Sequence, residues 1–516
     1  MAIDDEAVFP GENKCIQKVG IIMQYFQYFV ADLGTTNLKF ALMETPYRVL
    51  DTMEARNHLQ QDSEGKHEID PLVVFQQFMD LLKAMQAKYP EVNTLIFSSQ
   101  MHALLAMNEA GGIVQNTMTW ADLRARYVAQ EMQASGLAAA FFAQSGTPIH
   151  AMNPFVKLAY LNQARPTLFT DETVVFMDIK AYIIRQLTGE FVIDRATASS
   201  MGLLDIATNT WSKDLLKVVG LTENQLPKLV DSTKELPVKT NFIKALGLAD
   251  NFYILSGSTD GALANLSNLA YAIQGDHELS PFVLSFGTSA AVRTLTDQLS
   301  LHKSGRIFTY IADDQPHYVV GGPVNNAGSA LDWCYQQFGF MAKGQTFSDM
   351  IAILLAHDFS ASGPYFLPFL NGERAPYWNA YLQAEFKGVQ GHTSQLDMAK
   401  AVFEGVFFEI RQVVDMVFET ADLNQKMIQV NGKIFADPKI GQWIANIMGI
   451  TLQYVSGDDA SLIGAGVLVE GPNLWQDLSF STIAPDGQMA DKYKEKFLMY
   501  QKYADSADQI TKTILY

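Results

Sequence analysis

Residues 29–37, FVADLGTTN, and residues 282–290, FVLSFGTSA, are the two stretches that decide the fold. Each reads as an apolar strand that ends in a Gly-Thr turn, and a second apolar strand follows, at residues 38–44 and 291–295. Glycine permits such a turn because it adopts backbone angles that other residues avoid. A strand–turn–strand unit in each half predicts two related domains with phosphate bound between them. A match this short can also arise by chance, and that alternative stays open here.

The two turns carry groups that suit phosphate. Backbone amides and hydroxyls can donate to phosphate oxygens, and the turns supply them from Gly34, Thr35, Thr36, Gly287, Thr288 and Ser289. An ordinary β-hairpin is the competing interpretation of each turn. The sequence holds no GxxxxGK[ST] motif, so ATP chemistry at these turns would not be of the P-loop type.

Three further side chains lie beside the first turn. Asp32 precedes the turn and could hold Mg²⁺ through water, because Mg²⁺ keeps much of its hydration shell. Lys39 is close enough in the sequence to reach a phosphate across the hairpin, and Asn37 stands between turn and lysine. A hairpin with an exposed lysine is the alternative.

Short apolar runs alternate with amphipathic stretches throughout the chain. Residues 94–98 and 252–256 read as buried strands, whereas residues 71–88 and 398–419 have a helical pattern. This alternation predicts an α/β fold with strands buried between helices.

The domain boundary is expected in the polar stretch 274–280. The division is then an unassigned extension at residues 1–28, a first domain at residues 29–275, and a second domain at residues 276–516 that ends in a helical tail.

Composition limits the partners. The 516 residues include 37 Lys and Arg against 55 Asp and Glu, a net charge of −18, which argues against nucleic acid and anionic membranes as partners. An anionic substrate is still possible because a few local cations can outweigh the average. Two cysteines and an acidic N-terminus without a secretory signal favour the cytoplasm.

Residues 257–262, GSTDGA, place a carboxylate on a glycine-rich turn at the end of a strand. This is a suitable position for a general base, and phosphoryl transfer to a hydroxyl needs one group to accept the proton. Asp260 is therefore the candidate base, with Gly261 beside it. The competing interpretation makes Asp260 the N-cap of the helix that follows.

Two other segments suit a sugar. Met101 and His102 follow the strand at 94–98, and His102 could donate to a substrate hydroxyl. Trp120, Asp122 and Arg124 offer an aromatic wall, an acceptor for hydroxyls and a cation. The alternatives are a structural histidine, a helix-capping Asp122 and a solvated Arg124.

Glycines late in the chain, Gly432 and Gly464, would let a flat nucleotide base approach the backbone. Close packing of helices explains such glycines equally well.

Taken together, these motifs resemble the FGGY carbohydrate kinase family from about residue 29 to residue 466. The most specific stretch is 384–404, AEFKGVQGHTSQLDMAKAVFE, which is similar to the C-terminal signature of that family. Tyr160 stands where the family usually has Trp, and the stretch 430–438, VNGKIFADP, lacks the usual extra glycines and serine. The second departure puts the exact adenosine contacts in doubt.

The resemblance implies two actin-like, ribonuclease-H-like ATPase domains with a catalytic cleft between them, which bind ATP and Mg²⁺. It also implies that Asp260 is the catalytic base and that Met101 and His102 contact the sugar. The two turns, with Asp32 and Lys39, match the phosphate motifs of the family. The oligomeric state stays open, a homodimer included.

Within the family, four sequence segments of this chain are similar to those of the gluconate kinases: SSQMHALLAMN, TWADLRAR, SGTPIHAMNP and STDGALANL. Xylulose kinases usually carry Asn where this chain has Ala121 and Gly261. A gluconate substrate needs a cation for its carboxylate, and Arg124, Lys157 and His150 are the candidates. The rival hypotheses are a kinase for another sugar or polyol, such as xylulose or glycerol, and an actin-like or chaperone-like ATPase.

Overall fold

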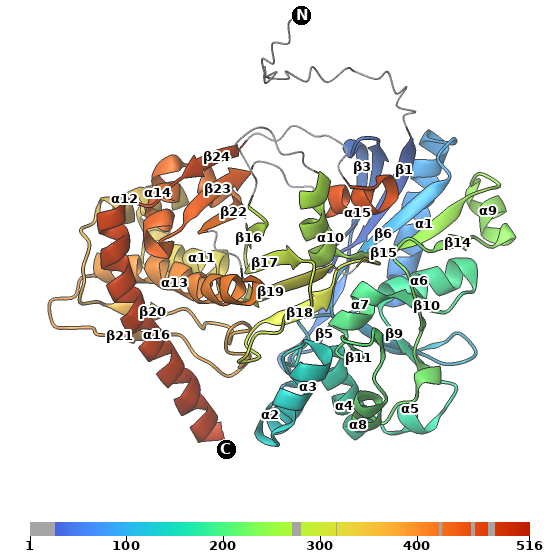
Figure 1. Ribbon diagram of the computed structural model, residues 1–516, viewed down its shortest axis with the longest axis horizontal. Helices are drawn as coiled ribbons and strands as arrows, with labels where there is room; N and C mark the ends of the chain where they lie inside the picture. The colour runs from blue at the N-terminus through green and yellow to red at the C-terminus, as the bar shows by residue number, and fades with distance from the viewer. Residues whose placement is uncertain are drawn as a thin grey trace, which may run out of the picture.

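The computed structural model describes residues 26–270, 280–315, 317–422, 426–455, 460–472 and 480–515. The chain forms two α/β halves that lie side by side, each built around its own sheet (Figure 1). The predicted boundary at 274–280 lies outside the described residues except for Ser280, and so does nearly all of the predicted extension at 1–28.

The first half contains a six-stranded sheet in the order β14-β15-β6-β1-β2-β3. Its strands are β1 (Gln27–Leu33), β2 (Asn37–Glu44), β3 (Arg48–Arg56), β6 (Thr94–Ser99), β14 (Glu235–Pro237) and β15 (Tyr253–Thr259). β1 runs antiparallel to β2 and parallel to β6, which in turn runs parallel to β15.

The second half contains a seven-stranded sheet in the order β18-β19-β17-β16-β22-β23-β24. Its strands are β16 (Phe282–Phe286), β17 (Ala290–Thr296), β18 (Phe308–Ile311), β19 (Tyr318–Val324), β22 (Met427–Asn431), β23 (Thr451–Val455) and β24 (Phe480–Ile483). β16 runs antiparallel to β17 and parallel to β22, and β22 runs parallel to β23.

The two sheets repeat one arrangement. In both, a central strand pairs with the second strand of its own hairpin on one side and with a parallel strand on the other, and a further parallel strand pairs with that one. The prediction of two related α/β units is confirmed, and the echo between 29–37 and 282–290 is structural. The predicted strand 252–256 is observed as β15, and the predicted helix 398–419 as the central part of α13 (Gln395–Ala421).

The helix α1 (Pro71–Lys88) shows why these residues fold as the sequence predicts. Asp70 caps its first turn by accepting from the amide of Leu72 at 2.9 Å, and Pro71 fits the first helical position. Apolar residues at helical spacing, Val74, Phe78, Leu82 and Met85, are buried. Their stripe packs on the first sheet, so one face of that sheet is covered.

Smaller elements complete each half. Those of the first half are β4 (Leu59–Gln61), β5 (His67–Ile69), β7 (Leu104–Met107), β8 (Ile113–Met118), β9 (Val175–Met177), β10 (Val192–Asp194), β11 (Leu204–Asp205), β12 (Thr210–Trp211), β13 (Lys228–Val230), α2 (Arg126–Ala134), α3 (Leu137–Ser145), α4 (Pro154–Ala164), α5 (Thr167–Thr170), α6 (Ile179–Thr188), α7 (Arg195–Ser200), α8 (Lys213–Val219), α9 (Thr240–Leu246) and α10 (Asp260–Leu266). Those of the second half are β20 (Tyr365–Leu367), β21 (Glu385–Lys387), α11 (Gly328–Gln337), α12 (Phe347–Ala356), α14 (Pro438–Met448), α15 (Ala460–Glu470) and α16 (Gly487–Leu515). The predicted helical tail is α16.

The helix α15 lies in the sequence between β23 and β24 of the second sheet but packs against the first half, beside α10 (Figure 1). A Cβ at Gly464 would lie 1.8 Å from the carbonyl oxygen of Leu263, so the two helices touch through their backbones. Glu470, at the end of α15, accepts hydrogen bonds from the hydroxyl of Tyr28 and the amide of Tyr47. One hydrophobic core therefore continues from the first sheet through both helices into the second half.

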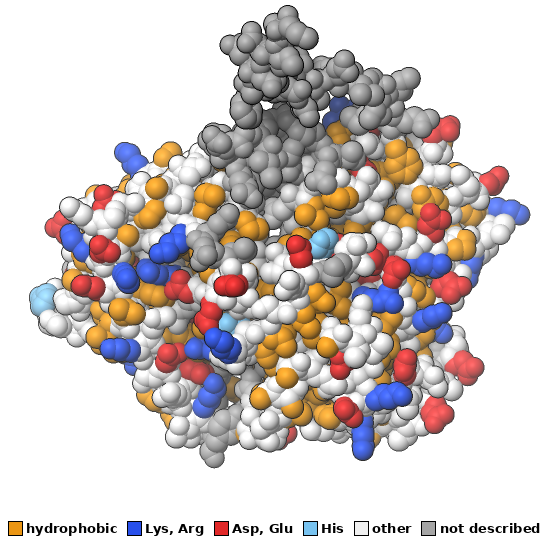
Figure 2. Space-filling view, in the orientation of Figure 1, with side chains coloured by type: hydrophobic (Ala, Val, Ile, Leu, Met, Phe, Trp, Pro, Cys, Tyr) orange, Lys and Arg blue, Asp and Glu red, His pale blue; other side chains and the backbone are white. Residues whose placement is uncertain are grey.

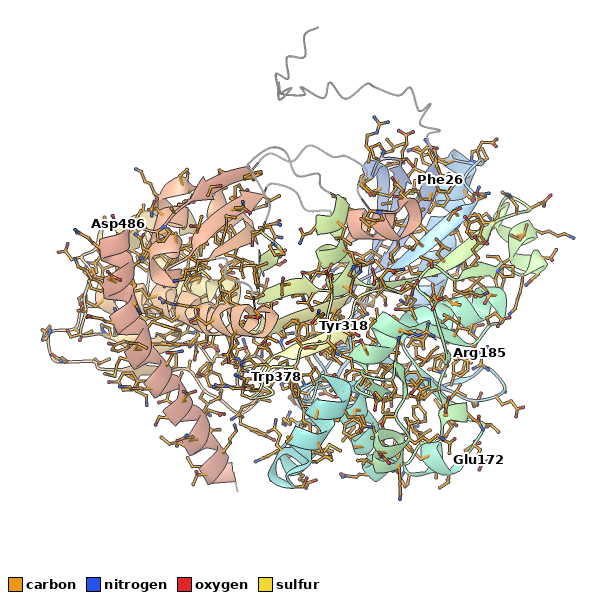
Figure 3. All side chains as sticks on the ribbon, in the orientation of Figure 1. Phe26, Glu172, Arg185, Tyr318, Trp378 and Asp486 are labelled. Atoms are coloured by element: carbon orange, nitrogen blue, oxygen red, sulfur yellow. The ribbon has the colours of Figure 1, made fainter. Side chains whose placement is uncertain are left out.

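The halves also meet along β18. The amide of Thr309 donates to the carbonyl of Gly146 at 2.9 Å, and the amide of Ile311 donates to the hydroxyl of Ser199 at 3.1 Å. Trp378, labelled in Figure 3, accepts at its carbonyl from the side chain of Gln133 in α2. These bonds fix the distance between the halves on this side.

Among the described residues, no helix is long and apolar enough to cross a membrane. Acidic and basic side chains are interspersed over the face shown in Figure 2.

The contact between α10 and α15 can be tested with Gly464→Ala. The added methyl group has no space against the backbone of α10, so we expect the free energy of unfolding to fall by about 1–3 kcal/mol. Urea unfolding measures this change. Gly391→Ala is the control, because a Cβ there meets nothing within 4 Å. Equal stability of the two variants would contradict the packing described here.

Candidate active site

A cleft between the two halves holds two adjoining cavities of about 410 and 320 Å³. Four residues line both of them: Asp260 from the first half, and Ser285, Arg293 and Asn431 from the second. Because strands from both sheets end here, side chains that are far apart in the sequence converge on one space.

The first turn is held in place by Asn57. Its side-chain amide donates to the carbonyls of Gly34 at 2.9 Å and Thr35 at 3.2 Å, and its backbone amide donates to Thr36 at 2.8 Å. The hydroxyl of Thr35 donates to Gln100 at 2.7 Å. Thr35 and Gln100 line the larger cavity, so this turn faces the cleft as predicted.

The second turn is held by the start of α11. The amides of Gly328 and Ser329 donate to the carbonyls of Gly287 and Thr288 at 2.9 and 3.0 Å. Gly287 and Ser289 line the larger cavity. The two Gly-Thr turns therefore come from different halves, and both border the cleft.

A β-bulge positions Asp260. The pairing of β15 with β6 shifts between Leu255 and Ser258, and Gly257 there has a φ of +70°. A side chain at Gly257 would collide with the carbonyl of Phe97, since its Cβ would lie 1.9 Å from that oxygen. Bulges of this kind re-aim the residues that follow them. As a result, Asp260, which directly follows β15, lies in the cleft.

Asp260 is not the N-cap of α10. That position belongs to Thr259, whose hydroxyl accepts from the amide of Ala262 at 3.2 Å. The carboxylate of Asp260 accepts a bond from the amide of Gly261 at 2.6 Å. The capping interpretation is wrong, and the carboxylate faces both cavities.

Burial raises the pKa of Asp260 to about 6, repulsion from Asp32 adds to this rise, and Arg293 opposes it. Burial also raises the pKa of Asp32, against a hydrogen bond from Ser98 at 2.7 Å and the charge of Lys39. A carboxylate with a pKa near neutrality can accept a proton and release it again. Asp260 thus has the properties of a general base.

His102 lines the larger cavity together with Met101 and Trp120. Its φ is +65°, a conformation that is uncommon outside glycine. Lys157 supports it, because the ammonium group donates to the carbonyls of His102 and Thr119, both at 2.7 Å.

The tautomer of His102 corrects one prediction. Nδ1 lies 2.9 Å from the carbonyl of Ser200, which can only accept, so Nδ1 carries the proton. Burial lowers the pKa of His102 to about 3, with the charge of Lys157 as a further cause, so the ring is neutral at pH 7. Nε2 is then an acceptor. His102 can accept a hydrogen bond from a sugar hydroxyl, whereas the sequence predicted donation.

Four predicted sugar contacts do not line these two cavities. Asp122 is fully buried and accepts bonds from Arg124, and Arg124 also pairs with Glu68. The guanidinium of Arg124 is therefore occupied by two carboxylates. Lys157 is occupied by backbone carbonyls, and His150 lines a separate, smaller cavity with Trp378. These contacts make the four residues supports of the site, and sugar contact at them stays a prediction.

Sequence reasoning missed two buried arginines in the cleft. Arg293 in β17 and Arg374 in the segment between β20 and β21 both line the larger cavity. The Nε of Arg293 is buried without a hydrogen-bond partner among the described residues. The sequence did contain a signal for Arg293, since it lies inside the apolar stretch 291–295. A charged residue in a buried strand is uncommon unless it is paired, and this indicates a functional role.

The late glycines lie beside the smaller cavity. Gly432 has a φ of +121°, and a Cβ there would lie 2.4 Å from the carbonyl of Phe286. Packing thus accounts for Gly432, as it does for Gly464. Their neighbours Asn431 and Ser461 line that cavity. Nucleotide contact at the two glycines stays a prediction.

Comparison with known proteins decides the family. Residues 27–267 match the N-terminal domain of the FGGY family of carbohydrate kinases, and residues 282–469 match its C-terminal domain. The chain belongs to this family. The fold is the two-domain, actin-like fold that the sequence predicts.

Relatives of this FGGY kinase include gluconokinases and xylulose kinases. It is 28% identical to a gluconokinase of Bacillus subtilis over 85% of this chain and 86% of the relative, and 22% identical to a xylulose kinase of Staphylococcus xylosus over 86% and 90%. Among solved structures, a gluconate kinase from Lactobacillus acidophilus has a TM-score of 0.85 at 28% identity and covers 94% of this chain and 98% of its own. A xylulose kinase from the same organism has a TM-score of 0.83 at 27% identity, with coverage of 93% and 98%.

The residues of the cleft fit a magnesium ion. Two buried carboxylates, Asp32 and Asp260, repel each other, and a divalent cation would relieve that repulsion. Mg²⁺ typically binds one or two carboxylates together with water and phosphate oxygens. Among the described residues there is no cluster of three or more ligating side chains. Asp32 as the ligand stays a prediction.

The raised pKa of Asp260 predicts the pH dependence of this kinase. A base must be ionised to accept a proton, so kcat/KM should fall about tenfold per pH unit below pH 6 and level off above it. Initial rates between pH 5 and pH 8 at saturating ATP measure the profile. A profile that stays level down to pH 5 would contradict Asp260 as the titrating base.

The ion pairs of Arg124 predict an effect on stability. Arg124→Met leaves the buried Asp122 without its cation, so we expect the free energy of unfolding to fall by about 3 kcal/mol. The KM for sugar at low temperature should change little. Thermal unfolding and steady-state kinetics measure the two effects, and a large KM increase without loss of stability would restore Arg124 as a sugar contact.

Proposed function

We propose that this FGGY kinase transfers the γ-phosphoryl group of ATP to the terminal hydroxyl of D-gluconate, giving 6-phosphogluconate and ADP. The observation that carries the proposal is the charge of the larger cavity. Asp260 lies there beside two buried arginines, Arg293 and Arg374, and among the described residues neither arginine makes an ion pair. Guanidinium groups that face a cavity outside any ion pair favour a substrate with a negative charge.

Sequence relatives support the same substrate. The gluconokinases of Bacillus subtilis and Bacillus licheniformis are 28% and 27% identical to this chain. Xylulose kinases are the second candidate, since one from Lactococcus lactis is 23% identical over 93% of the chain.

The proposed reaction uses groups already on the cleft wall. A carboxylate oxygen of Asp260 accepts the proton of the substrate hydroxyl while the hydroxyl oxygen bonds to the γ-phosphorus. The bond from that phosphorus to the β,γ-bridging oxygen breaks, and ADP leaves with the electron pair. Amides and hydroxyls of the two Gly-Thr turns would offset phosphate charge. A bound Mg²⁺ would neutralise further charge on the phosphates.

Neutral His102 and Trp120 would hold the sugar. Nε2 of His102 accepts a bond from a hydroxyl, and the indole of Trp120 offers an apolar face to the carbon chain. The cleft should close on the substrate and exclude water, because water would otherwise compete for the phosphoryl group.

ADP release with Mg²⁺ and ATP tests the substrate. Gluconate, xylulose, ribulose and glycerol are compared with a blank without sugar. We expect release well above the blank with gluconate. Release with xylulose or glycerol alone would replace gluconate as the substrate and leave the phosphoryl-transfer site in place.

Asp260→Asn tests the base. Turnover should fall by about 10²–10⁴-fold, since the amide cannot accept the proton. Folding should survive. Because burial raises the folded pKa above the unfolded value, ionisation of Asp260 costs stability as the pH rises through 6. The variant lacks this cost and should be at least as stable as the wild type at pH 8, by urea unfolding. Near-normal turnover would remove Asp260 from the mechanism.

A further inference from the structure

Arg374 is set in the wall of the larger cavity by contacts from both halves. Its Nε donates to the side-chain oxygen of Asn325 at 2.6 Å. Its guanidinium carbon lies 4.8 Å from the ring centre of Trp120, in the arrangement of a cation–π contact. Trp120 belongs to the first half and Asn325 to the second, so the guanidinium bridges the cleft.

The terminal nitrogens of Arg374 are left for a ligand. Among the described residues, the bond to Asn325 is the one hydrogen bond that this guanidinium makes. One face of the group lies on the indole, and Nε is used. The remaining two nitrogens are the pair that binds a carboxylate through two parallel hydrogen bonds.

The nearest acidic neighbour, Glu373, does not take this role. Its carboxylate accepts bonds from the amides of Asn325 at 2.6 Å and Arg374 at 2.8 Å, and from the side chain of Asn326 at 2.9 Å. Glu373 thus ties the segment of Arg374 to the segment of Asn325, and so fixes the side chain that accepts from Nε of Arg374.

Charge in the cavity favours an anion. Burial is the main cause that lowers the pKa of Arg374, to about 10, and the charge of Arg293 contributes. Arg374 therefore remains a cation at pH 7, as does Arg293. Glu373 opposes this lowering, but its carboxylate is not in an ion pair with the guanidinium, so an anion that reaches Arg374 is stabilised by its charge.

The two arginines line different parts of the site: Arg293 lines both cavities, and Arg374 lines the larger one alone. Arg293 lines both cavities and is close enough to Asp260 to lower its pKa. Arg374 lines the larger cavity, with His102 and Trp120. In a sugar acid phosphorylated at its terminal hydroxyl, the carboxylate is at the opposite end of the carbon chain. Arg293 is thus placed for the phosphoryl end, and Arg374 for the other end.

We propose that Arg374, seated on Trp120 and held by Asn325, binds the carboxylate of the sugar acid and makes this kinase select an acid over an uncharged polyol. The assignment rests on the proposed function. The proposal assigns the carboxylate contact to Arg374, in the second half, in place of the candidates Arg124, Lys157 and His150. Residues of both halves would then hold the substrate.

The test compares Arg374→Met with Arg293→Met, two matched changes in one cavity. ADP release is measured against D-gluconate and against D-glucitol, which carries a CH₂OH group in place of the carboxylate. For Arg374→Met we expect the KM for gluconate to rise by about 10²-fold, the value for a lost charged bidentate contact. Any release with glucitol should fall less than release with gluconate, so the ratio of kcat/KM for gluconate to that for glucitol should fall. For Arg293→Met we expect kcat to fall with either substrate.

Binding without turnover gives a second readout. Gluconate alone should raise the unfolding temperature of the wild type and of Arg293→Met, but not that of Arg374→Met. If Arg374→Met does not fold, Asn325→Ala takes its place, with a smaller increase in the KM for gluconate than for Arg374→Met and a smaller change with glucitol than with gluconate.

Three outcomes separate the two proposals. If the wild type phosphorylates gluconate but Arg374→Met keeps its KM, the assignment of Arg374 is wrong and the proposed function stands. The same holds if the selective loss of gluconate falls on Arg293→Met. If the wild type phosphorylates an uncharged sugar and not gluconate, both proposals are wrong.

Discussion

The parallel pairing of β1, β6 and β15 is the constraint on which the rest of the site depends. These three strands end at one edge of the first sheet, and there they present Asp32, Ser98 and Asp260. Ser98 stabilises the charge of Asp32, and the bulge in β15 brings Asp260 close enough for the two carboxylates to repel each other. This repulsion is one cause of the raised pKa of Asp260, and it also prepares the edge for a cation.

The second sheet supplies what the first lacks. Its matching turn borders the same cleft, and its strand β17 adds Arg293 opposite the carboxylates. The cleft is therefore acidic on one wall and basic on the other. Such an arrangement suits a reaction in which a hydroxyl loses a proton on one side while negative charge develops on a phosphoryl group on the other.

The strands, the repeated turn and Asp260 could be predicted from the sequence because each depends on residues that are neighbours in the chain. Apolar runs, a glycine and a carboxylate after a strand are local signals. The cations could not be assigned in this way. Arg124 looks free in the sequence, but Glu68 reaches it from β5. Arg374 looks paired with its neighbour Glu373, but the carboxylate of Glu373 is held by amides. Whether a charge is available depends on contacts between distant segments.

The packing of α15 against the first half has a consequence for folding during synthesis of the chain. The face of the first half that α15 covers is apolar, and it includes Val30 and Leu263 in the continuous core. A ribosome delivers the first half long before residues 460–470, so this face stays uncovered until most of the second half has been synthesised. Exposed apolar surface of this kind favours aggregation during synthesis. The two halves are thus repeats in architecture, yet the first half reaches its final form only after the second.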